Sequence, residues 1–136
     1  MTAVSIPWAV QVAVFDRLTA HIATAGKTWP VFDHVPQNQR ASFVQIGPIA
    51  TPTDDILAAE SSLVVVTLIA WSKEAGKKEA HQMAAEIRAA LHEQDLPLSS
   101  GTAYHVTVDR QYIDRDDAVP GFLYQSTTIL TVKVDH

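Results

Sequence analysis

The chain has 136 residues, of which 47% are hydrophobic and 18% are charged, a composition that is typical of one folded domain and excludes a disordered chain. It contains no cysteine and carries a formal net charge of −5. These values exclude disulfide frameworks and thiolate metal sites, and they argue against binding to nucleic acid by phosphate neutralisation.

We therefore expect a single domain over residues 1–136. Residues 1–7 lack the features of a secretory leader. The apolar run at residues 63–71 is about half the length that a membrane span needs. We expect neither a signal of export nor a membrane segment.

The first predicted element is a helix over residues 6–25. Ser5 is a candidate N-cap, Pro7 suits the first turn, and Gly26 is placed to close the helix. Its apolar residues recur at helical spacing, namely Val10, Val14, Leu18 and Ile22. Asp16, Arg17 and His21 fall largely on the other side. We interpret this helix as an amphipathic core element without a binding site.

A loop over residues 27–40 precedes the short alternating run at 42–46, which predicts a strand that ends at Gly47-Pro48. Residues 47–59 show no periodicity and contain Asp54 and Asp55. This segment predicts a long exposed loop, and long loops in compact domains are often functional.

The next predicted strand, residues 61–72, is apolar on both faces. Leu63, Val65, Ile69 and Trp71 lie on one face, and Val64, Val66, Leu68 and Ala70 lie on the other. Helices cover only one face of the sheet in a two-layer domain, so we expect a neighbouring subunit to cover the second face. Burial of both faces by loops of the same chain is the alternative.

Residues 75–94 predict a second amphipathic helix, with Glu74, Lys78, His81, Arg88 and His92 on the wet side. Two long alternating runs follow, at 104–113 and 122–134, joined by a charged turn at 114–121. The predicted fold is therefore α+β, a two-layer sandwich in the order α-β-β-α-β-β. We expect a mainly antiparallel sheet of about four strands with two helices on one face.

No arrangement of residues predicts catalysis. His81 and His92 share a helix face but lie about 16 Å apart at a rise of 1.5 Å per residue, too far to bind one metal ion. The sequence contains neither a nucleophilic serine flanked by glycines at a strand-to-helix turn nor a glycine-rich phosphate-binding loop. We predict no catalytic, cofactor-binding or metal site, and no enzyme.

An acidic cluster in the predicted hairpin turn comprises Asp114, Asp116 and Asp117. Arg115 interrupts it, and no calcium-loop pattern surrounds it, so we interpret it as a solvated turn. A second hypothesis is that these acids face a DNA channel and let a duplex slide without sticking.

Two short segments resemble the phage and prophage tail-completion, or tail-terminator, family. They are Val31-Phe32-Asp33-His34-Val35-Pro36-Gln37 and, after it, Ser42-Phe43-Val44-Gln45-Ile46-Gly47. The likeness continues through residues 65–72, 79–91 and 122–134. Ser42 departs from the pattern, because many members carry proline before the aromatic residue. Asp33 and Pro36 are also explained by a role in the turn into the strand.

The resemblance implies a hexameric ring on the head-proximal end of a tail tube, in a virion tail assembled in the cytoplasm of a bacterial host. Its implied partners are the major tail tube protein and a head–tail connector or stopper protein, with DNA passing through the ring without specific binding and with no cofactor. Gene transfer agents and tail-derived bacteriocins use similar proteins.

Within this interpretation, we expect Leu63, Val65 and Trp71 to anchor the subunit interface. Asp54, Asp55, Arg115 and Asp116 are the expected polar contacts to the tube or connector. A connector or tail-tube subunit is one alternative function. Another is a small ligand-binding domain with Tyr104, His105, Tyr112 and Tyr124 lining a pocket between helices and sheet.

Overall fold

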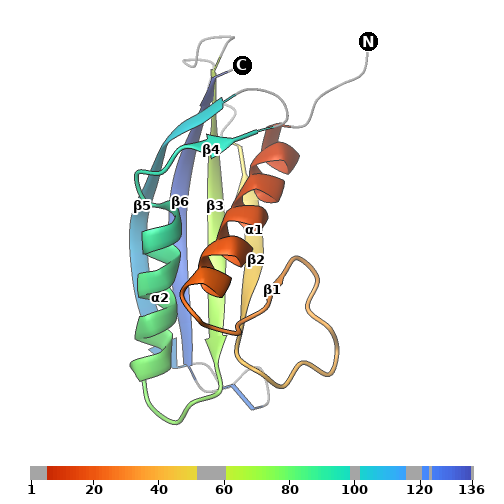
Figure 1. Cartoon of the computed structure of the whole chain (residues 1–136), viewed down its shortest axis with the longest axis vertical. Helices are drawn as coiled ribbons and strands as arrows, with labels where there is room; N and C mark the ends of the chain where they lie inside the picture. Colours follow the sequence, from red (N-terminus) through yellow and green to blue (C-terminus); the bar gives the residue numbers. More distant parts are fainter. Residues whose placement is uncertain (1–5, 52–60, 99–101, 116–120, 123, 136) are drawn as a thin grey trace.

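The computed structural model describes residues 6–51, 61–98, 102–115, 121–122 and 124–135. Its elements are α1 (Ile6–Thr24), β1 (Val31–Phe32), β2 (Phe43–Ala50), β3 (Ser61–Ser72), α2 (Lys78–Leu91), β4 (Leu96–Pro97), β5 (Thr102–Arg115) and β6 (Tyr124–Asp135). Both helices pack on one face of one sheet (Figure 1). The predicted α+β class and two-layer arrangement are confirmed.

The sheet has the strand order β1-β2-β3-β6-β5-β4. β1 pairs with β2 in parallel, and all the other pairs are antiparallel. The four predicted strands are its long members, and the two-residue strands β1 and β4 extend it to six. Strands of two residues are too short to produce an alternating pattern, so the sequence indicated only about four.

Several strand ends differ from the prediction, among them the C-terminal ends of β2 and β5. β2 continues through Gly47-Pro48 to Ala50, because a register irregularity between Ile46 and Ile49 accommodates the proline beside β3. β5 extends to Arg115, so Asp114 and Arg115 pair with β6 instead of forming the hairpin turn. The predicted bounds of β3 are correct.

The main core lies between the helices and the sheet. α1 contributes Val10, Val14, Leu18 and Ile22 to it, as the helical spacing predicted. Gly26, at a φ of 77°, ends this helix, and Lys27 N donates to Ile22 O at 3.1 Å. The inner face of β3 supplies the fully buried Val64, Val66, Leu68 and Ala70.

Polar side chains join the two helices to each other. Arg17 donates from Nε to Ala90 O at 3.1 Å and from its terminal nitrogen to Gln94 Oε1 at 2.9 Å. His21 Nε2 lies 2.8 Å from Glu86 Oε2. Arg17 and His21 are therefore half-buried at the helix pair, and the prediction that they fall on the solvent side was wrong. In the described part of the chain, no helix is long and apolar enough to cross a membrane.

Candidate functional site

The face of the sheet opposite the helices is the first candidate surface, which we call the helix-free face. Alternation places Leu63, Val65, Thr67 and Ile69 of β3 on it, all half-buried, next to Ile129 and Thr131 of β6. No described helix covers this face (Figure 1). The sequence correctly predicted that β3 presents apolar residues to both sides of the sheet.

Trp71 shares this face with Leu63 and Val65 but lies in a different environment. It is 9% exposed, stacks on Phe43 at 6.4 Å between ring centroids, and donates from Nε1 to Gln45 Oε1 at 3.2 Å. Phe122 meets Phe43 edge to face at 5.3 Å. The structure thus brings Leu63 and Val65 together as accessible residues and places Trp71 within a small aromatic core.

The four polar residues expected to contact partners are not brought together in the described structure. Asp54, Asp55 and Asp116 lie outside the described residues. Arg115 is exposed at the end of β5, where it pairs with Tyr124. It belongs to a strand end, and the prediction that placed it in the turn was wrong.

A second surface, missed by the sequence prediction, runs along α1. Trp8, Val12 and Phe15 are 59%, 40% and 36% exposed, and we call them the α1 ridge. They border a hollow of about 170 Å³ that Asp33 and Ile46 also line. Their spacing of four and three residues is itself a helical stripe. This signal was present beside the core stripe, but we had assigned no site to this helix.

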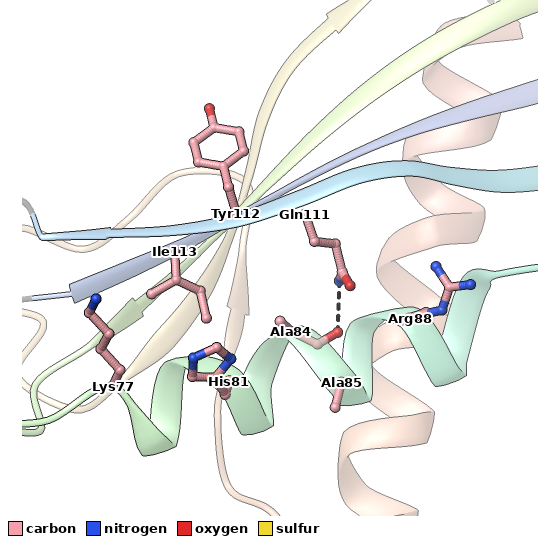
Figure 2. Close-up of a pocket in the computed structure, with 8 residues that line it drawn as sticks. All are labelled: Lys77, His81, Ala84, Ala85, Arg88, Gln111, Tyr112 and Ile113. Atoms are coloured by element: carbon pink, nitrogen blue, oxygen red, sulfur yellow. Dashed lines mark hydrogen bonds between the residues drawn. The ribbon is translucent and has the colours of Figure 1, made fainter.

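A third surface is a cleft between α2 and β5, of about 560 Å³, which we call the α2–β5 cleft. Figure 2 shows His81 and Arg88 projecting from α2 along its rim, Lys77 at the N-cap of the helix, and Ile113 directed toward the helix from β5. Gln111 Nε2 crosses the cleft floor to Ala84 O at 2.8 Å. The described lining residues include no carboxylate, so this cleft is locally basic on an acidic chain.

Of the residues expected to line a pocket of a ligand-binding domain, Tyr112 is among the lining residues of the α2–β5 cleft and Tyr124 is not. The Tyr112 ring points away from α2 (Figure 2) and lies 4.9 Å from the Arg110 guanidinium. Tyr124 has the strand parity of Ser126 and Thr128, which are buried on the helix side. These two tyrosines therefore occupy opposite faces of the sheet. The side chains of Tyr104 and His105 lie outside the described part.

Among the residues with described positions, no three histidine or carboxylate side chains gather as a possible metal site. His92 instead accepts a hydrogen bond at Nδ1 from Val108 N at 3.0 Å, a bond that joins α2 to β5. The three surfaces present side chains suited to packing and ion pairing. Surfaces of this kind are suited to contacts with macromolecular partners.

Comparison with known proteins agrees with this interpretation. A family model described as tail completion protein gp17 matches residues 12–122. The fold is similar to that of a chain in the solved virion of a native gene transfer agent particle, with a TM-score of 0.80 and 22% sequence identity. That match covers 98% of this chain and 100% of the other. No curated protein matches.

Proposed function

The chain belongs to the tail completion protein gp17 family, and from this premise we propose that it is a structural protein of a phage-type tail and not an enzyme. In this proposal, its copies form a hexameric ring on the head-proximal end of the tail tube. The ring ends polymerisation of the tube and joins the tail to the head connector.

The observation that carries this proposal is the helix-free face. Leu63, Val65 and Ile69 form an apolar strip along β3 that the helices leave uncovered. A two-layer domain gains stability when such a strip is buried, and a neighbouring subunit can bury it without a change of fold. We propose Leu63 and Val65 as interface anchors, with Trp71 holding the end of the strip from within its aromatic cluster.

The proposed partners are other copies of the chain, the major tail tube protein and a connector or stopper protein. Asp54, Asp55, Arg115 and Asp116 remain the proposed polar contacts to these partners. The proposed location is the head-proximal end of the virion tail, after assembly in the cytoplasm of the bacterial host. DNA would pass through the ring without sequence-specific contacts, since the chain carries a net charge of −5.

The test combines native mass with electron microscopy. The purified chain is examined over a concentration series, and is then added to polymerising tail tube protein from the same particle. We expect closed rings with the mass of a hexamer, a ring at one end of each tube, and tubes that stop growing. Unlimited tube growth with no ring at either end would overturn the proposed terminator function.

Two results would instead favour the alternative functions. Long polymers built from this chain alone would indicate a tail-tube subunit, because tube proteins add to one another without a stop. Rings that bind the head connector but ignore tube ends would indicate a connector subunit.

A further inference from the structure

The α1 ridge and the α2–β5 cleft lie on opposite sides of the helical layer. The hollow beside the ridge includes Ile46 of β2, which is second in the sheet order from the β1 edge. The cleft borders β5, which is second from the β4 edge. The ridge and the cleft therefore belong to opposite halves of the sheet, with α1 on the β2 side and α2 on the β5 side (Figure 1).

The two surfaces are compatible in size and polarity. Trp8, Val12 and Phe15 form an exposed apolar row on α1, and Trp8 is the most exposed large apolar side chain in the described part, at 59%. The cleft has about 560 Å³ of space, and Ala84, Ala85 and Ile113 contribute apolar walls to it. Protein sites of 300–1,000 Å³ accept groups well above the size of an indole ring.

The two surfaces are also complementary in charge. Asp16 follows Val12 by one helical turn and is exposed, and Asp33 lines the hollow beside the ridge. Lys77, His81 and Arg88 surround the cleft. Two acidic copies repel each other on average, so a contact that aligns these acids with these bases is favoured over other orientations.

From these features we infer that the α1 ridge of one copy docks into the α2–β5 cleft of the next, with Trp8 as its main anchor. The inference rests on the proposed ring and adds a second contact between neighbouring copies, beside the one proposed for the helix-free face. Each copy would offer one ridge and one cleft, so the contact is head-to-tail. Head-to-tail contacts produce rings when the rotation closes, whereas a twofold contact would stop at a dimer.

The absence of cysteine from the chain permits a direct test by cross-linking. The double variant V12C/A85C places one thiol on the ridge and one in the cleft. With a short bismaleimide, we expect a ladder of covalent oligomers that ends at the closed ring. The matched control A20C/A85C moves the first thiol to another exposed residue of the same helix, and should give no ladder.

A second variant tests the anchor itself. W8E removes the indole and brings a charge into the contact, so ring formation should require at least about tenfold more protein, as for an interface hot spot. The unfolding transition of W8E is measured beside that of the parent, so that a loss of assembly counts only where the variant is folded. V12A, in the middle of the row, removes a much smaller side chain and should weaken assembly less.

The outcomes separate this inference from the proposed function. Rings that form in V12C/A85C without a ladder, or rings that tolerate W8E, would overturn the ridge-in-cleft contact and leave the ring in place. A chain that stays monomeric at every concentration, gives no ladder and ignores tube ends would overturn both.

Discussion

The hydroxyl of Ser42 donates a hydrogen bond to the carboxylate of Glu79, at the point where β2 begins beside the first turn of α2. Ser72, at the end of β3, donates to the same Glu79 oxygen at 2.7 Å. Lys73 N in turn donates to Ser42 Oγ at 3.1 Å. The residue that departs from the proline of the family pattern therefore ties two strands to a helix, a contact that proline could not make.

Removal of this shared acceptor should destabilise the fold. Glu79→Ala leaves the buried hydroxyls of Ser42 and Ser72 without their acceptor, so we expect the free energy of unfolding to fall by about 1–3 kcal/mol. Glu79→Gln keeps a carbonyl oxygen at this position and should cost less than half as much. Urea denaturation of both variants checks this, and equal losses would contradict the assigned role of the oxygen.

The helix-to-helix contact of Arg17 predicts a second loss. Arg17→Met keeps the apolar stem but removes the bonds to Ala90 O and Gln94, and Ala90 O lies in the last turn of α2, where carbonyls lack helical partners. We expect a loss of about 2 kcal/mol. Arg40→Met, at an exposed position, is the matched control and should stay within about 0.5 kcal/mol of the parent. A thermal shift that is the same for both would refute this assignment.

Ser126 and Thr128 on β6 should respond in opposite directions. Both are fully buried on the helix side. Thr128 Oγ1 accepts from Gln111 Nε2 at 3.0 Å, whereas the Ser126 hydroxyl has no hydrogen-bond partner among the described residues. Thr128→Val should cost about 1 kcal/mol, and Ser126→Ala should cost nothing or add up to about 1 kcal/mol. Guanidinium denaturation that shows a clear loss for Ser126→Ala would mean that this hydroxyl is bonded.

Burial also separates the three proposed interface anchors. Trp71→Ala removes a 9% exposed ring from the aromatic cluster and should cost about 3–5 kcal/mol of stability. Leu63→Ser, at a half-buried position on the helix-free face, should cost about 1 kcal/mol. Its main effect should be on ring assembly, measured by native mass. Normal assembly of Leu63→Ser would remove this residue from the interface.

Charge reversal offers an independent check of the contact between ridge and cleft. In the proposed contact, Asp16 and Asp33 of one copy face Lys77 and Arg88 of the next. D16K/D33K would place four like charges there, so association should weaken about two- to fivefold. Adding K77E/R88E to the same chain restores opposite signs and should recover the loss. Sedimentation at low and high salt measures both, and recovery should shrink as salt screens the pairs. A quadruple variant weaker than the double variant would speak against the alignment.

Elements with a periodic apolar pattern could be predicted from the sequence. The helical spacing of Val10, Val14, Leu18 and Ile22 predicted α1, and the alternation from Leu63 to Trp71 predicted the two faces of β3. Local periodicity reports which face of an element is apolar, and the structure confirmed these faces. The spacing of Trp8, Val12 and Phe15 was visible in the sequence, but their exposure was not, because an apolar side chain beside a core stripe is ordinarily assigned to the core.

The parts that sequence reasoning missed depend on contacts between distant segments. β1 is defined by the pairing of Val31 and Phe32 with Val44 and Gln45. Two residues are too few for the sequence to predict this pairing. The α2–β5 cleft combines bases from α2 with the end of β5, which the sequence separates by a loop and a strand. The packing of Trp71 with Phe43 and Phe122 was also missed, because the three residues are far apart in the sequence. The role of Trp71 at the interface stays a prediction.

Pro48 has a consequence for the free chain before assembly. It lies in β2, beyond the two residues that β1 covers, where the backbone register against β3 is irregular. Proline and a bulge at this edge oppose the addition of a further strand, which is the first step of aggregation through exposed sheet edges. This edge of the free subunit is thereby protected, and contacts between copies at this edge would be made by side chains and not by a shared sheet.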